Sequence, residues 1–331
     1  MTRNQLRDYV YHVRRREFQD WETAIRSPPL SQVSSADQRL FLRFMADVHI
    51  EATGELSRMI GWGHPQLLFL TKCGALNMFI DCTFRCVPKG FYQLMVIMVY
   101  CPAHQLFIPV FFVLLQSKDE DVYQHAIMMF IAATGWTADA TTVTVDYEQA
   151  LIKTAATQFR GSKIIGCLFH WKQAIRRKLL TLKIPENIIS IFIGKGGQLE
   201  VLCIIPVGEI MTKGIYYIRQ KTDEGGYTEK FDIFWNYLKA TWMTKYDPNA
   251  WNIQGIVSSG DTDVIVNRTN NACESFNRRL NEKIGRAHPT MQILIKVLNE
   301  ISCDYANKMT TIAHSRKRKL IADLLIDWKL M

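Results

Sequence analysis

The chain has 331 residues, which is long for one simple domain and predicts about two structural units. A composition that is 48% hydrophobic and 21% charged excludes a disordered, collagenous or coiled-coil protein. Forty Lys and Arg residues against 31 Asp and Glu residues give a net charge of +9, which favours a polyanionic partner. The basic residues gather in four clusters, at 14–16, 172–178, 278–283 and 316–319, and this clustering favours nucleic acid over evenly spread surface charge.

Eight scattered cysteines, several in apolar segments, indicate reduced and buried thiols in an intracellular protein. The N-terminus opens no apolar signal sequence, so we expect a protein that is not secreted. Residues 94–116 are apolar over a membrane-spanning length, but Pro102 and its polar neighbours divide them. We therefore predict two buried strands, 94–100 and 106–115, and no membrane partner.

The elements predicted in chain order begin with a helical region over residues 1–74, where helix caps precede a helix-like periodicity at 40–60. Five strands follow, at 77–87, 94–100, 106–115, 141–145 and 163–168. Helices are predicted from a capping box at Ser117 to residue 134, and over 146–159 and 170–182. Three hairpin-linked strands and then alternating helices and strands indicate an α/β fold of the ribonuclease H-like architecture, with helices around a mixed sheet.

Beyond residue 182 the pattern is irregular, with glycine breaks and an aromatic stretch at 231–251. We interpret the aromatic residues as the core of a mostly helical insertion and not as a base-stacking surface. The predicted organisation begins with a helical N-terminal region (1–74) and the first part of a catalytic core (75–182). The insertion (183–265), the final helices of the core (266–310) and a basic tail (311–331) follow.

Two aspartates stand out by their context. Asp81 lies within an apolar predicted strand, where a carboxylate must be paired, hydrogen-bonded or bound to metal; an outward-facing strand position is the alternative. Asp146 directly follows a predicted strand, at a place where open α/β sheets carry functional groups. It could also be the first member of a capping box with Gln149.

Glu274 lies on a strongly amphipathic helix predicted over residues 270–284. Its carboxylate could cap that helix or pair with Arg278, one turn away. The helix buries Cys273, Phe276 and Leu280 in this interpretation, so Glu274 shares a polar face with Asn277 and Asn281 and could face a cleft.

Two C-x-x-H motifs could bind metal. Cys167 and His170 lie at the end of a predicted strand, and one such pair supplies at most half of the ligands of a zinc site. Cys101 and His104 repeat the spacing, which leaves a Cys₂His₂ site built from both pairs as an alternative, although no sequence feature brings the pairs together.

Taken in order, these motifs resemble the transposase domain of Mutator-like elements, a branch of the ribonuclease H-like DDE transposases. The resemblance covers roughly residues 75–310 and rests on the ordered set of motifs: IDCTF at 80–84, VDYEQAL at 145–151, CLFHW at 167–171, TNN at 269–271, ESFN at 274–277 and LN at 280–281.

The resemblance implies Mg²⁺-dependent DNA strand cleavage and strand transfer, with Mn²⁺ as a substitute ion and zinc not expected. Asp81, Asp146 and Glu274 would hold two ions about 3.5–4 Å apart. Cys167 and His170 would form a structural or DNA-contacting motif. DNA is the implied partner, no small-molecule substrate is expected and a homo-oligomer is left open. The expected DNA contacts are Lys172, Arg176, Arg177, Lys178, Arg278 and Arg279.

Elements of this kind are expected to carry a zinc-type DNA-binding module before the catalytic domain. Residues 1–74 hold only Cys73, so we expect a truncated or domesticated copy. A catalytically silent DNA-binding or regulatory descendant of a transposase is the first alternative, and an unrelated zinc-stabilised nucleic-acid-binding domain is the second. The basic run at 316–319 predicts nuclear localisation in a eukaryotic source.

Overall fold

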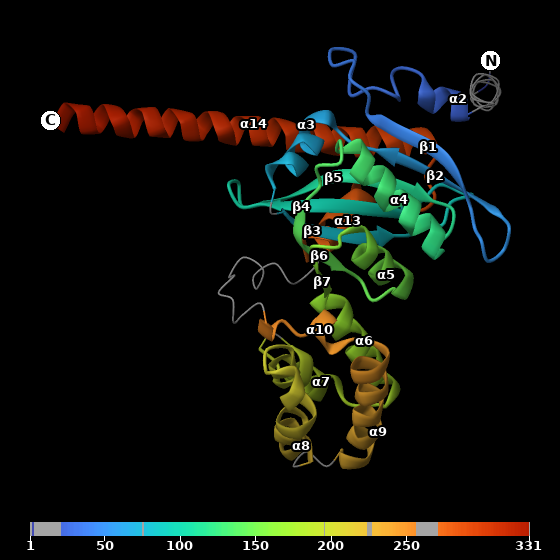
Figure 1. The fold of residues 1–331 in the computed structure, drawn as a ribbon, viewed down its shortest axis with the longest axis vertical. Coiled ribbons are helices and arrows are strands. Elements are labelled where there is room, and N and C mark those ends of the chain that lie inside the picture. The colour runs from blue at the N-terminus through green and yellow to red at the C-terminus, as the bar shows by residue number, and fades with distance from the viewer. Residues whose placement is uncertain are drawn as a thin grey trace. The chain divides into compact units, whose positions relative to one another are not determined.

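The computed structural model describes residue 2 and residues 21–74, 76–194, 196–223, 227–255 and 271–330 (Figure 1). The basic run at 14–16 and the TN dipeptide at 269–270 lie outside these ranges, as do the side chains of the basic run at 316–319. The chain divides into two compact units. The first comprises Met1–Leu76, Cys82–Asp139 and Ser275–Met331, and the second comprises Asn77–Asp81 and Ala140–Glu274.

A seven-stranded sheet is the main feature of the fold, in the order β1-β2-β5-β4-β3-β6-β7 (Figure 1). β1 pairs with β2, β2 with β5 and β5 with β4 in antiparallel fashion, whereas β6 and β7 are parallel. The predicted α/β class with a mixed sheet is confirmed, and this sheet with its flanking helices is compatible with a ribonuclease H-like fold. The strands are Leu42–His49 (β1), Leu56–Trp62 (β2), Leu76–Thr83 (β3), Gln93–Cys101 (β4), Leu106–Leu115 (β5), Ala140–Val145 (β6) and Lys163–Gly166 (β7).

The helical prediction for residues 40–60 is wrong, because this segment forms β1 and β2. The two strands pair with each other, and residues 59–62 of β2 pair with residues 112–115 of β5. That partner lies about fifty residues further along the chain, so local periodicity carries no sign of it. Tertiary pairing decides the conformation here, as it commonly does for strands.

The prediction of two buried strands within residues 94–116 is confirmed by β4 and β5, which pair along their length. Their apolar residues are almost continuous because helices cover both faces of the sheet. Phe111 contacts Phe130 of α4 (Glu120–Ala133), whereas the next residue, Phe112, stacks on Phe276 of α13 (Asn271–Ile284). Since successive side chains of a strand point to opposite faces, α4 and α13 lie on opposite sides of β5.

α4 begins without the predicted capping box. Its N-cap residue is Asp119, and the Ser117 hydroxyl instead bonds to the Ser57 hydroxyl at 3.2 Å. The other helices of the first unit are α2 (Trp21–Arg26), α3 (Pro65–Leu68), the 3₁₀ turn η1 (Phe69–Cys73) and α14 (Met291–Leu330).

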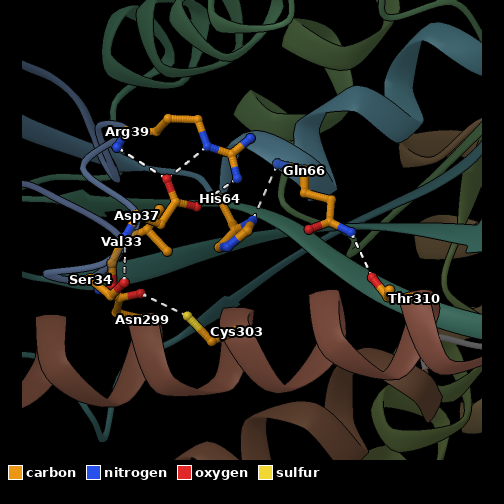
Figure 2. Close-up of polar contacts among 9 residues, drawn as sticks. All are labelled: Val33, Ser34, Asp37, Arg39, His64, Gln66, Asn299, Cys303 and Thr310. Atoms are coloured by element: carbon orange, nitrogen blue, oxygen red, sulfur yellow. Dashed lines mark hydrogen bonds and ion pairs between the residues drawn. The ribbon is translucent and has the colours of Figure 1, made fainter.

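α14 is joined by side-chain hydrogen bonds to the N-terminal part of the first unit (Figure 2). Asn299 Nδ2 donates to the backbone oxygens of Gln32 and Val33, at 3.0 and 2.9 Å. Gln66 Nε2 donates to Thr310 Oγ1 at 3.0 Å. Residues that are more than two hundred positions apart in sequence therefore form one compact unit.

The second unit consists of the β6–β7 region and a series of helices. Its α-helices are α5 (Gln149–Gln158), α6 (Leu168–Thr181), α7 (Glu186–Ile193), α8 (Ile215–Asp223), α9 (Thr228–Leu238) and α10 (Pro248–Trp251). Tighter or wider helical turns lie between them: η2 (Gln198–Cys203), η3 (Val207–Glu209), η4 (Ile210–Gly214) and η5 (Lys239–Lys245).

The aromatic stretch at 231–251 forms a core, as predicted. Phe231, Phe234, Trp235, Trp242 and Trp251 are all buried within one hydrophobic cluster. The rings meet mostly edge to face, an arrangement that adds to the free energy gained by burial.

Among the described residues, no single helix is long and apolar enough to cross a membrane. One bent pair of helical segments, Glu186–Cys203 with Val207–Gln220, is long and apolar enough when the two segments are taken together. Most of its apolar side chains, Phe192 and Ile210 among them, lie in the hydrophobic cluster of the second unit. Packing within that unit accounts for their apolar character.

Candidate active site

Asp81 is buried within the sheet. It lies on β3, after three buried residues at 78–80, and only 4% of its surface is exposed. The alternative of an outward-facing, solvated strand position is therefore excluded. A carboxylate in such a place must be compensated by hydrogen bonds, by a cation or by protonation.

Asp146 directly follows β6, the neighbour of β3 in the sheet. Its Oδ1 accepts a hydrogen bond from the backbone N–H of Glu148 at 3.0 Å. Because α5 begins only at Gln149 with Glu148 as its N-cap, the alternative interpretation of Asp146 as part of a capping box with Gln149 is excluded. Burial raises the pKa of the Asp146 carboxyl, and the bond from Glu148 opposes this.

Two hydrogen bonds place Asp81 and Asp146 at the same level of adjacent strands. Leu76 N donates to Asp139 O at 3.2 Å, and Thr142 Oγ1 donates to Asn77 Oδ1 at 2.8 Å. Both bonds join the beginnings of β3 and β6, so the strands run in the same direction. Asp81 lies four residues after Asn77 (81 − 77 = 4), and Asp146 lies four residues after Thr142 (146 − 142 = 4).

Tyr147 anchors the segment that carries Asp146. Its ring lies over Gly166, where a Cβ atom would fall 2.4 Å from the ring, so that only glycine permits this approach. The ring also meets Trp242 and Tyr246 edge-on, at centroid distances of 4.7 and 5.4 Å. The helical region at 239–246 thus packs directly on the residue after Asp146.

Tyr246 completes this anchor and is the site residue that the sequence analysis missed. Its hydroxyl donates to the backbone oxygen of Tyr147 at 2.8 Å. Burial raises the pKa of Tyr246, a hydrogen bond with the Gln149 side chain opposes this, and the negative charge of Asp146 adds to the rise. Its only sequence signal is the aromatic stretch, which does not reveal which residue contacts Tyr147.

Glu274 lies in the first turn of α13. Its Oε1 atom is buried and has no hydrogen-bond partner among the described residues. Desolvation by burial raises the pKa of this carboxyl to about 7. The predicted buried face of the helix is confirmed, since Cys273, Phe276 and Leu280 are all buried.

All three acids belong to the second compact unit. Their chemistry fits Mg²⁺, which prefers oxygen ligands, and the unpartnered Glu274 Oε1 is an acceptor that a cation would satisfy. Across the described part of the chain, however, no three His, Cys, Asp or Glu side chains form a group that could hold a metal ion. The structure aligns Asp81 with Asp146 but does not complete a three-ligand set with Glu274.

Cys167 and His170 lie where β7 leads into α6. Cys167 is fully buried, and its backbone N–H donates to Val145 O at 2.8 Å, which extends the pairing of β6 with β7. His170 Nδ1 is buried and has no hydrogen-bond partner among the described residues. Burial lowers the pKa of His170, and the charge of Arg177 lowers it further, so the ring is neutral near pH 7.

The second C-x-x-H pair lies in the other unit. Cys101 Sγ and His104 Nδ1 are 3.1 Å apart in the turn between β4 and β5, within the first unit, whereas Cys167 and His170 belong to the second. The described residues contain no Cys₂His₂ group made from these pairs.

The basic residues of α6 mostly contact their own unit. Lys172 pairs with Glu200 and donates to Gly194 O at 3.1 Å, and Arg176 pairs with Glu186. The Lys178 ammonium lies 5.2 Å from the centre of the Tyr237 ring. Arg177 is exposed and donates to Gln173 O at 3.3 Å. Within the described ranges, Arg177 is therefore the one of these four whose side chain makes no ion pair or ring contact.

The two arginines of α13 differ from each other. Arg278 is exposed. Arg279 is also exposed, but its Nη2 donates to the Tyr305 hydroxyl of α14 at 2.6 Å. Both belong to the first unit.

Comparison with known proteins relates part of the chain to a protein family. Residues 77–174 match the family model described as the MULE transposase domain. The match runs from the beginning of β3 into α6 and includes Asp81, Asp146, Cys167 and His170. No curated protein matches the chain.

The matched segment holds two of the three predicted acids, Asp81 on β3 and Asp146 directly after the adjacent β6. Of the six motifs that resembled Mutator-like elements, the first three fall within it. A transposase domain implies interaction with DNA, in keeping with the net charge of +9. By this match, residues 77–174 are a MULE transposase domain.

Proposed function

We propose that the chain is a DDE-type transposase domain that cleaves and joins DNA strands with Mg²⁺ held by Asp81, Asp146 and Glu274. The observation that carries the proposal is the alignment of Asp81 with Asp146 within the matched segment. It is supported by the buried carboxyl oxygen of Glu274 in the same unit, which has no hydrogen-bond partner in the described part of the chain. When bound, two Mg²⁺ ions would activate the attacking oxygen and stabilise charge on the leaving oxygen.

The residues of the chain have separate tasks in this proposal. β3 holds Asp81 rigidly within the sheet, and the end of β6 presents Asp146 beside it. Tyr147 and Tyr246 fix the backbone that follows Asp146, which limits how far its carboxylate can move. Glu274 contributes a desolvated oxygen that has no hydrogen bond from the residues that the structure describes. The exposed Arg177 and Arg278 supply charge for phosphate contacts.

A nicking assay tests the proposal. The chain is incubated with supercoiled plasmid and Mg²⁺, and the conversion to nicked circles is followed with time. Asp81→Asn, Asp146→Asn and Glu274→Gln should each reduce the rate by more than about 100-fold, since even the partners of metal ligands cost up to that factor. Glu282→Gln, which removes an exposed carboxyl from the same helix as Glu274, is the matched control and should nick like the wild type.

A second candidate is a DNA-binding protein without catalytic activity. It is favoured by the finding that the described residues contain no group of three metal-ligating side chains. If the wild type binds plasmid but nicks it no faster than Asp81→Asn does, this second candidate replaces the enzyme.

A further inference from the structure

A cavity between α13 and α14 in the first unit has no role in the proposed reaction. Its volume is about 140 Å³, enough for several water molecules. The buried side chains of Phe276 and Ile301 form its apolar part. The remaining lining residues are polar or charged and come from both helices.

The charges that line this cavity do not balance. Lys283 of α13 pairs with Asp304 of α14 at 3.3 Å, so these two charges offset each other. Arg279 and Lys308 remain, one on each helix, and both are exposed. With three cations and one carboxylate, the cavity carries a net charge of +2 (3 − 1 = 2).

Tyr305 orients one of these cations. Its side chain is only 9% exposed, and its hydroxyl oxygen accepts the bond from Arg279 Nη2 at 2.6 Å. The centre of the guanidinium group lies 5.8 Å from the Tyr305 ring. Because a guanidinium group accepts no hydrogen bond, the hydroxyl proton of Tyr305 is not used in this contact.

The cavity therefore combines donors that suit an oxyanion. The Tyr305 hydroxyl, the other N–H groups of Arg279 and the ammonium group of Lys308 can each donate to an acceptor. The planar fork of arginine matches the geometry of a phosphate group, and lysine adds a flexible point charge.

We propose that this cavity binds a phosphodiester group of the DNA backbone. The choice of ligand rests on the proposed function, and the exposed Arg278 on the same helix extends the positive charge beside the cavity. A phosphate held here, by residues of the first unit, would fix the register of the duplex without reading its sequence.

Fluorescence anisotropy with a short labelled duplex tests this assignment on the full chain over a series of salt concentrations. Arg279→Gln and Lys308→Gln should each make the slope of log K against log salt less negative by about 0.9, the value for one phosphate contact. Tyr305→Phe and Arg279→Lys keep the charge, so they should weaken binding about 3- to 10-fold at an unchanged slope. Lys296→Gln, at a lysine of α14 whose side chain is 74% exposed outside the cavity, is the control for lost charge alone.

The same variants distinguish a phosphodiester group of DNA from free phosphate as the ligand of the cavity. Inorganic phosphate should compete with the duplex more strongly than chloride at equal ionic strength, and this difference should vanish in Arg279→Gln. Slopes for Arg279→Gln and Lys308→Gln that equal that of Lys296→Gln would overturn the assignment while leaving DNA binding intact. A wild type that is thermally stabilised by inorganic phosphate but binds no duplex would overturn both the DNA ligand and the proposed function, and would reassign the cavity to free phosphate.

Discussion

At the scale of single residues, Glu274 is a candidate catalytic group in unfavourable surroundings. Its Oε1 is buried without a hydrogen bond from the described residues, and the pKa of its carboxyl is raised from 4.5 to about 7. An unpartnered buried carboxylate lowers the stability of the folded chain. A structural cap or ion pair, the alternative interpretations of Glu274, would be expected to lower its pKa instead.

The raised pKa of Glu274 predicts how the stability of the metal-free chain changes with pH. The folded state binds the proton more tightly than the unfolded state does, so the contribution of Glu274 to stability is fully present below pH 4.5 and is lost as pH rises to about 7. The glutamine of Glu274→Gln does not titrate. The free energy of unfolding of this variant should therefore rise relative to that of the wild type between pH 4.5 and about 7, and the difference should stay constant at higher pH. Urea unfolding in the presence of EDTA measures the difference, with Glu282→Gln as the control. A difference that is constant with pH would contradict the account.

At the scale of elements, the β6–α5 connection contacts the helical region at 239–246 within the second unit. Tyr246 donates to the Tyr147 backbone, while Trp242 and Tyr246 stack with their ring centres 4.9 Å apart. This link couples the helical region directly to the position of Asp146.

Tyr246→Phe removes the hydroxyl group and keeps the ring, so it tests this link. We expect a loss of about 0.5–1.5 kcal/mol in the free energy of unfolding, as is typical for one hydrogen bond. We also expect weaker Mn²⁺ binding, because the Asp146 segment is held less firmly. Tyr216→Phe, at a tyrosine that is 63% exposed in the same unit, is the control and should change neither quantity. Stability loss with unchanged Mn²⁺ affinity would show that the link is structural only.

The elements also show how far sequence predicts this protein. Local sequence was enough to predict several elements. β4 and β5 are continuous apolar runs divided by a turn, β6 is rich in β-branched residues, and the buried face of α13 follows a helical period. β1 and β2 were not predictable, since their conformation depends on pairing with the distant β5. Ser117 and Asp146 have capping-box spacing, yet each helix begins later, at Glu120 and Gln149. Asp81 stood out as an acid within an apolar strand, and Asp146 stood out because it directly follows a strand. Tyr246 could not be assigned, because its contact with Tyr147 spans about a hundred residues of sequence.

At the scale of the whole molecule, the candidate sites lie in two compact units. The three candidate acids and the aromatic anchor of Asp146 belong to the second unit, and the α13–α14 cavity belongs to the first. α13 contributes to both, since Glu274 lies in the second unit and Arg279 in the first. In this account the chain separates metal chemistry from one of its phosphate contacts.

The most direct test of the central claim is the thermal stability of the chain against Mn²⁺, with and without a short duplex. Wild type should be stabilised by about 2.7 kcal/mol when Mn²⁺ is present at 100 times its dissociation constant. Asp81→Asn, Asp146→Asn and Glu274→Gln should each lose this stabilisation, and Glu282→Gln should keep it. Such a result would show that the three acids bind metal as one site. A wild type that Mn²⁺ does not stabilise under either condition, or acid variants that respond as the wild type does, would contradict the proposed metal site.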